Sequence, residues 1–286
     1  MKISATKPSS KLTWLLLFSF LLLISVHSAQ ASPQAAIPEG RVSVGTGELY
    51  YRVFGSGPPL LLLHGYTNAG VAWDGFVPEL AKQFRVFIFD LPGHGRSDRV
   101  RPNFSHGEAA SDILVALMKL GVKEFSAVGH SSGGMILLHM ALQQPDRLKS
   151  MVLVATSSRL PENARRIGMQ ASFEALPKEL LAVLRQWHPG GEQQIRWLVE
   201  QQRRIAADPH EMNLNATQLR RITTRTLVVH PDRDQILPLE LAIEIHQNIS
   251  NSSLMVVPDS RHEFILRNGL GSRLLSTVMQ AFLMRR

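Results

Sequence analysis

Short apolar runs alternate with longer helical patterns along most of this chain. Residues 41–55 form two β-rich segments separated by a Gly-Thr-Gly turn, a pattern typical of a hairpin. Six later runs have the near-continuous apolar character of strands buried on both faces, at 60–65, 85–90, 125–130, 150–155, 225–230 and 253–258. Apolar residues at helical spacing predict helices at about 106–120, 132–144, 238–249 and 264–284. This alternation predicts an α/β protein whose mostly parallel sheet has helices on both faces.

The alternation is interrupted once. Residues 156–224 have helical composition and no predicted strand, between the run ending at Ala155 and the run starting at Arg225. Connections between strands and helices are normally short, so this segment is predicted to be a helical insertion. Because it follows the carboxyl end of a strand, we expect it to cover the edge of the sheet where open α/β proteins bind ligands.

The first 31 residues have the pattern of a secretory signal peptide. Three lysines accompany an apolar stretch at 12–26, and Ala-Gln-Ala at 29–31 is a small-x-small cleavage signal. The apolar stretch is shorter than the roughly 20 residues of a membrane span, which favours cleavage over an uncleaved membrane anchor. We therefore expect an exported protein, periplasmic or secreted, with no stable anchor after cleavage. Its mature chain would have a Pro/Ala linker (32–40) and one folded domain (41–286).

Composition excludes several classes of function. The chain has 31 Lys and Arg against 23 Asp and Glu, and loss of the three signal-peptide lysines leaves 28 − 23 = +5. The basic residues are scattered rather than gathered in a stripe with aromatic residues, so nucleic acid is not an expected partner. The absence of cysteine excludes disulfides and thiol nucleophiles. No His, Asp and Glu spacing is typical of a metal site, and neither metal nor cofactor is expected.

The sequence AVGHSSGGM, at 127–135, places a polar turn directly after an apolar run. Its Gly129-x-Ser131-x-Gly133 pattern fits a nucleophile elbow, a tight strand-to-helix turn that exposes a serine hydroxyl. The glycines allow neighbouring chain to pass close to the turn. Ser131 is the candidate nucleophile, and the adjacent Ser132 is the competing one.

A serine is a weak nucleophile unless a base accepts its proton and a third group orients that base. His262 follows the last apolar run and is the candidate base. Two acids, Asp232 and Asp234, follow the preceding run, and either could orient the histidine. The chain order of serine, acid and histidine is that of the α/β-hydrolase fold.

Over residues 41–286 the chain resembles the α/β-hydrolase family, in its serine esterase and lactonase-type branch. The resemblance rests on the segments HGYTNAGVAWDGF, FDLPGHGRSD and GHSSGG and on the helical insertion, which resembles the family's cap. It implies a mostly parallel eight-stranded sheet with helices on both faces and a cap at about 156–224. The family's acid follows a Gly-x-x-Asp pattern. Here Pro231 takes the glycine position, and this register selects Asp234 over Asp232.

The resemblance also implies an oxyanion hole made by the backbone N–H groups of Tyr66 and Ser132. Four aromatic residues are candidates for lining the substrate pocket, with simple packing as the alternative: Trp73, Phe173, Trp187 and Trp197.

A serine at the elbow implies an acyl-enzyme intermediate. We therefore expect a serine hydrolase that cleaves a carboxylic ester or lactone without a metal. Export favours substrates met outside the cytoplasm, such as xenobiotic esters or macrolide-type lactones, and the latter would connect the protein with antibiotic resistance. The alternatives are acyl transfer or perhydrolysis, and a non-catalytic ligand-binding protein of the same fold.

Overall fold

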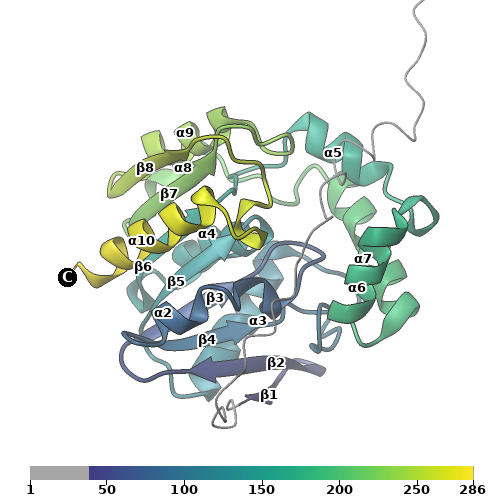
Figure 1. Ribbon diagram of the computed structural model, residues 1–286, viewed down its shortest axis with the longest axis horizontal. Helices are drawn as coiled ribbons and strands as arrows, with labels where there is room; N and C mark the ends of the chain where they lie inside the picture. The colour runs from purple at the N-terminus through teal and green to yellow at the C-terminus, as the bar shows by residue number, and fades with distance from the viewer. Residues whose placement is uncertain (1–38, 286) are drawn as a thin grey trace, which may run out of the picture.

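A computed structural model describes residues 39–285, which are built around one eight-stranded sheet (Figure 1). The strand order is β1-β2-β4-β3-β5-β6-β7-β8. The strands are β1 (Glu39–Val44), β2 (Gly47–Phe54), β3 (Pro59–Leu63), β4 (Arg85–Phe89), β5 (Phe125–His130), β6 (Leu148–Val154), β7 (Arg225–Pro231) and β8 (Ser252–Val257). β1 and β2 form the predicted hairpin, β2 pairs antiparallel with β4, and all other pairs are parallel. The predicted α/β architecture with a mostly parallel sheet is thus confirmed.

The N-terminal predictions fall largely outside the structure. The signal peptide and linker residues 32–38 lie outside the described residues, and residues 39 and 40 of the predicted linker belong to β1. Within residues 39–285, no helix is both long enough and apolar enough to cross a membrane.

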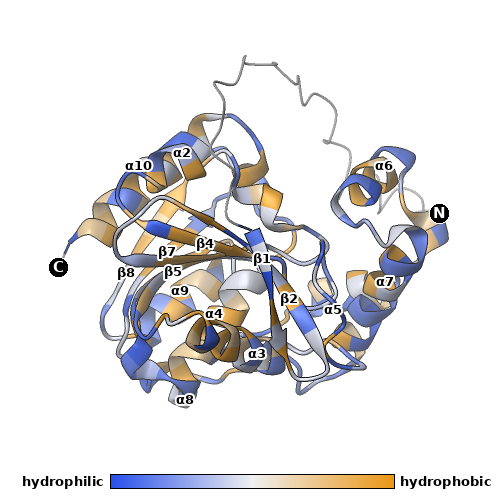
Figure 2. Cartoon of the chain, turned by 90° about the horizontal axis from the view of Figure 1, so that it is seen from below, coloured by the Kyte–Doolittle hydropathy of each residue, from blue (hydrophilic) through white to orange (hydrophobic). Residues whose placement is uncertain are grey.

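Helices cover both faces of the sheet, as Figure 2 shows. One face carries α3 (His106–Lys119), α4 (Ser132–Gln143), α8 (Ala216–Arg220) and α9 (Leu239–Asn248). The other face carries α2 (Val77–Leu80) and α10 (Leu270–Met284). The last helix begins later than predicted. Residues Phe264–Leu266 form a separate 3-10 turn, and the poor helix former Gly269 precedes the start of α10.

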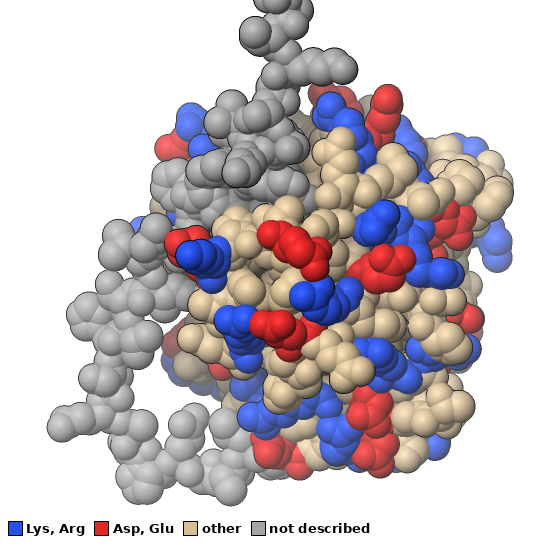
Figure 3. Space-filling model, turned by 90° about the vertical axis from the view of Figure 1, so that its right-hand side faces the viewer, with Lys and Arg blue, Asp and Glu red and all other residues tan. Residues whose placement is uncertain are grey.

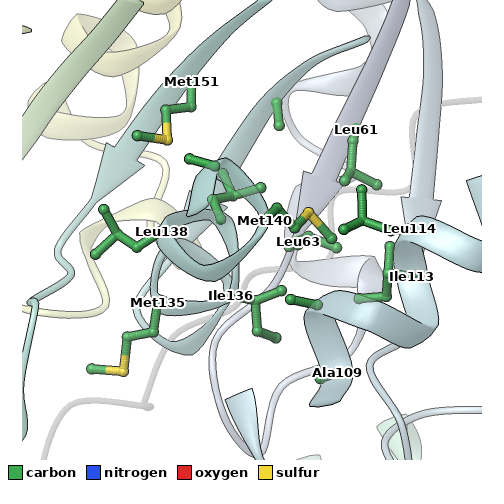
Figure 4. Close-up of a cluster of buried hydrophobic side chains, with 14 of the residues drawn as sticks. Leu61, Leu63, Ala109, Ile113, Leu114, Met135, Ile136, Leu138, Met140 and Met151 are labelled. Atoms are coloured by element: carbon green, nitrogen blue, oxygen red, sulfur yellow. The ribbon is translucent and has the colours of Figure 1, made fainter. Parts of the chain in front are cut away.

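The apolar character of the central strands follows from this layering. Along β3, Leu61 and Leu63 pack toward α3 and α4, whereas Leu60 and Leu62 pack toward the opposite face, and all four are fully buried. Figure 4 shows Leu61 and Leu63 facing the apolar side chains of α3 and α4. Removing a buried leucine of this kind typically costs about 2–5 kcal/mol, so the packing of these strands contributes strongly to the stability of the sheet.

The insertion between β6 and β7 forms a helical cap, with α5 (Glu162–Met169), α6 (Lys178–Trp187) and α7 (Gly191–Ala207). Both α5 and α6 pack against α7, and the three helices lie together at one side of the sheet in Figure 1. Figure 3 shows this side of the molecule, where positive and negative side chains are interspersed.

The two ends of the cap are paired with each other. Arg159 and Asn213 form an isolated antiparallel bridge. On either side of it, Leu160 N–H donates to Met212 O at 3.1 Å and Leu214 N–H donates to Ser158 O at 2.9 Å. The cap therefore leaves the core and returns to it at nearly the same point.

Candidate active site

Ser131 lies on the sharp turn between β5 and α4. Its φ of 51° and ψ of −118° are unusual for a residue with a side chain, and such backbone strain is typical of a nucleophile elbow. The flanking glycines are required by close packing. A Cβ on Gly129 would lie 2.5 Å from the Gly133 backbone, and a Cβ on Gly133 would lie 2.3 Å from Leu63 O. The elbow is thus locked against the end of β3.

Ser131, His262 and Asp234 form a continuous hydrogen-bonded chain. Ser131 Oγ lies 3.0 Å from His262 Nε2, and His262 Nδ1 lies 2.7 Å from Asp234 Oδ2. The other oxygen of Asp234 accepts hydrogen bonds from the N–H groups of Ile236 and Leu237, at 2.8 and 2.9 Å. A carboxylate can only accept, so Nδ1–H of a neutral His262 donates to Asp234 and Nε2 is free to accept the Ser131 proton.

The electrostatics of this pair favour a charged imidazole. Burial alone would raise the pKa of Asp234, but His262 and the two backbone N–H groups lower it below its ordinary value. Burial alone would lower the pKa of His262, but the adjacent Asp234 carboxylate raises it to about 8. This carboxylate therefore stabilises the imidazolium that proton transfer from Ser131 would create.

The turn after β7 directs its two acids to different partners. Asp232 is exposed, and its Oδ1 accepts a hydrogen bond from Ser260 N–H at 3.0 Å. Pro231 is the last residue of β7 and lies opposite Val257 of β8. Asp232 N–H donates to Val257 O at 3.1 Å, so the proline does not shift the turn away from the sheet. Of the two acids, Asp234 is the one that reaches His262.

Tyr66 and Ser132 both lie near Ser131 in the structure. Ser132 is the first residue of α4, directly after Ser131. Tyr66 follows Gly65, where an added Cβ would lie only 3.3 Å from Ser131 Cβ and 2.9 Å from His130 Nδ1. The loop after β3 therefore passes over the elbow at this residue, and the backbone of both candidate oxyanion residues is close to Ser131.

The four candidate pocket aromatics lie in three different environments. Trp73 is fully buried in the core and packs against Phe76 with ring centroids 5.5 Å apart. Phe173 and Trp187 pack on the small apolar cluster inside the cap. Trp197, on α7, borders a recess that also includes Phe104. A pocket-lining role for these four residues stays a prediction.

Two residues that hold the cap beside the site were not singled out in the sequence. His188, which follows α6, accepts a hydrogen bond from Gly95 N–H and donates to Thr67 O, both at 2.9 Å. Gln194 of α7 donates to Gly93 O and Gly95 O. Their partners are about 100 residues away in the chain, and no local pattern reveals such contacts.

A second chain of polar residues was also missed. Ser132 Oγ lies 3.0 Å from His106 Nε2, and His106 Nδ1 lies 2.6 Å from Glu211 Oε1. Among the described residues, no group of three or more His, Asp or Glu side chains is arranged to hold a metal ion, and this includes the pair of His106 and Glu211.

Comparisons with known proteins agree with this fold. Residues 58–188 match the family model of the alpha/beta hydrolase fold. The chain is 26% identical over 238 residues to the pimeloyl-(acyl-carrier protein) methyl ester esterase of Vibrio vulnificus. The alignment covers 75% of this chain and 91% of that protein.

Solved structures extend the comparison over the described domain. A hydrolase from Pseudomonas aeruginosa matches with a TM-score of 0.73 and 23% identity, covering 88% of this chain and 100% of that chain. The enol-lactonase from Burkholderia xenovorans matches with a TM-score of 0.68 and 19% identity, covering 86% and 100%. These two likenesses show the fold. The chain therefore has the α/β-hydrolase fold and is similar in sequence to a methyl ester esterase.

Proposed function

We propose that this protein is an exported serine hydrolase that cleaves a carboxylic ester or a lactone through an acyl-enzyme on Ser131. The observation that carries the proposal is the hydrogen-bonded chain of Ser131, His262 and Asp234, with distances of 3.0 and 2.7 Å. This arrangement supplies a nucleophile, a base and an orienting carboxylate in the order that acyl transfer requires.

In acylation, His262 Nε2 accepts the Ser131 proton while Oγ forms a bond to the carbonyl carbon of the substrate. The carbonyl electron pair moves to the oxygen, and the N–H groups of Tyr66 and Ser132 bind the resulting oxyanion. The imidazolium then donates its proton to the alcohol oxygen as the C–O bond breaks. Asp234 stays ionised throughout, since its pKa is lowered and it only orients and stabilises the imidazolium.

In deacylation, water replaces the alcohol. His262 accepts a proton from water as its oxygen attacks the acyl carbon, and the imidazolium returns a proton to Ser131 Oγ when the acyl bond breaks. The product is a carboxylic acid, or a hydroxy acid when the substrate is a lactone.

The substrate class is supported by the names of related proteins and by the N-terminal sequence. The relatives described above include a methyl ester esterase and an enol-lactonase. The secretory pattern of residues 1–31 favours a substrate outside the cytoplasm, such as a xenobiotic ester or a macrolide-type lactone. Hydrolysis of such a lactone would confer resistance to the antibiotic.

The proposal is tested by a fluorophosphonate probe and a substrate panel. The mature protein should be labelled by the probe and should hydrolyse at least one of p-nitrophenyl acetate, a γ-lactone and a macrolide. Ser131→Ala should abolish both labelling and hydrolysis, whereas Ser43→Ala, at an exposed serine of β1, should affect neither. A wild-type protein that is neither labelled nor active on the panel would contradict the proposal.

A further inference from the structure

Both residues assigned to the oxyanion hole reach the cap through their side chains. The Tyr66 hydroxyl donates a 2.9 Å hydrogen bond to Leu198 O in α7. Burial raises the pKa of Tyr66 well above its ordinary value, so this donor keeps its proton. Ser132 reaches the cap through His106 and Glu211, as described above. Two separate polar links therefore join the elbow region to the cap.

Glu211 accepts hydrogen bonds from both the core and the cap. On the core side, its Oε1 accepts hydrogen bonds from the backbone N–H of His106 at 2.9 Å and from the ring at 2.6 Å. On the cap side, Arg165 of α5 donates hydrogen bonds to the carbonyl oxygens of Ala206, Asp208 and Glu211. The position of this carboxylate therefore depends on the seating of the cap.

The Glu211 carboxylate is ionised. Burial would raise the pKa of Glu211, but hydrogen bonds and charge from His106 lower it to about 2. The carboxylate accepts from His106 Nδ1, and the other ring nitrogen, Nε2, lies within hydrogen-bond distance of the Ser132 hydroxyl. His106 and Ser132 are 1% and 5% exposed, so water does not readily replace these bonds.

The two links are packed against one another. Phe104 lies between them, with its ring centroid 5.4 Å from that of Tyr66 and 5.3 Å from that of His106. Its backbone N–H donates to Gln201 Oε1 of α7 at 3.0 Å. A displacement of the cap would therefore move both links together.

We infer that Tyr66, His106 and Glu211 are positioning residues that hold the two oxyanion donors in place when the cap is seated on the core. The inference rests on the proposed function. His106 contacts the side chain of Ser132 rather than the nucleophile, so it is not a second catalytic base. Oxyanion donors act only at hydrogen-bond distance from the developing charge, and a catalytic arrangement must be held to within about 0.5 Å.

The test uses the mature protein, p-nitrophenyl acetate and two conservative variants, Tyr66→Phe and Glu211→Gln. Each variant should lower kcat about tenfold and change KM less than about twofold, since the links act on the transition state rather than on substrate binding. Affinity for a trifluoromethyl ketone, which forms a tetrahedral oxyanion with the catalytic serine, should fall by a similar factor. Glu200→Gln is the matched control, because Glu200 lies on α7 and pairs only loosely with Arg203 at 3.7 Å.

A double-mutant cycle tests whether Ser132 and Glu211 act through the same chain. Ser132→Ala should lower kcat about as much as Glu211→Gln, and the double variant should lose no more than about twofold beyond either. If the two residues acted independently, the fold-losses in kcat of the single variants would instead multiply in the double variant. If Glu211→Gln does not fold, the Tyr66→Phe and Ser132→Ala variants still decide the question.

The inference is overturned if the variants keep the wild-type kcat and ketone affinity and lose only thermal stability. It is equally overturned if Glu200→Gln shows the same loss of kcat. A failure of the proposed function gives a different result: the wild-type protein itself would neither react with a fluorophosphonate nor hydrolyse the ester. In that case this inference would be wrong as well.

Discussion

The carboxylate of Asp234 and the imidazole of His262 are joined by a 2.7 Å hydrogen bond, and the carboxylate raises the pKa of His262 to about 8. An unperturbed histidine titrates near 6.5. At neutral pH the free protein would therefore have a largely protonated base, which cannot accept the Ser131 proton.

This relationship gives the first prediction, on pH. The kcat/KM for a neutral ester should rise with pH through an apparent pKa of about 8, because only neutral His262 is active in the free enzyme. The measurement is a pH–rate profile from pH 5 to 10 at constant ionic strength. A profile that is flat above pH 6 would show that His262 titrates elsewhere or is not the base.

The second prediction separates the two acids of the turn after β7. Asp234→Asn should lower kcat on the order of 10⁴-fold, because an amide in this position can hold the wrong imidazole tautomer. Asp232→Asn should cost less than about tenfold, since Asp232 bonds to Ser260 N–H instead.

The two variants remove the same charge from the same loop and are controls for one another. Steady-state kinetics on one ester substrate is sufficient. Equal losses would indicate a general electrostatic effect and would remove Asp234 from its assigned role.

The third prediction concerns the packing of the elbow. Gly133→Ala would place a Cβ 2.3 Å from Leu63 O, a backbone atom that cannot move without displacing β3. We expect a loss of stability on the order of 2–4 kcal/mol and loss of most activity. Gly75→Ala is the control, because no atom lies within 4 Å of its added Cβ. Urea denaturation compares the two, and similar midpoints for both variants would contradict the packing described here.

The fourth prediction concerns the N-terminus. If residues 1–31 are a signal peptide, the exported protein should begin at Ser32. Intact-mass measurement of protein from the periplasm or medium determines this directly. Full-length mass in the membrane fraction would mean that the apolar segment is retained as an anchor.

The parts of the fold that could be predicted from sequence are those with a local cause. The central strands are buried on both faces, so their runs are almost wholly apolar, and Leu60–Leu63 illustrate this. The elbow was recognisable because its strained backbone and close packing require glycines at fixed positions around Ser131. His262 and the acidic turn could be predicted as site residues because they follow the last two strands of the sheet.

The remaining features depend on contacts between distant segments. Asp232 and Asp234 could be separated only through the register of a family pattern, because both follow β7. His106 and Glu211 are 105 residues apart, and their bond exists only because the cap folds back onto α3. Likewise, the aromatic residues of the cap could not be placed before the packing of α6 and α7 was known.

The bridge between Arg159 and Asn213 has a consequence for protein engineering and for the evolution of this chain. Because the cap's two ends lie side by side, the segment between them is an exchangeable module whose replacement need not shift β6 or β7. The entropy of closing such a loop changes by only about 0.6 kcal/mol for each doubling of its length, so grafts of quite different size are tolerable at this point. Substrate preference could thus be altered by transplanting a whole cap onto the same sheet, provided that the graft keeps the hydrogen bonds from the cap to Tyr66 and His106.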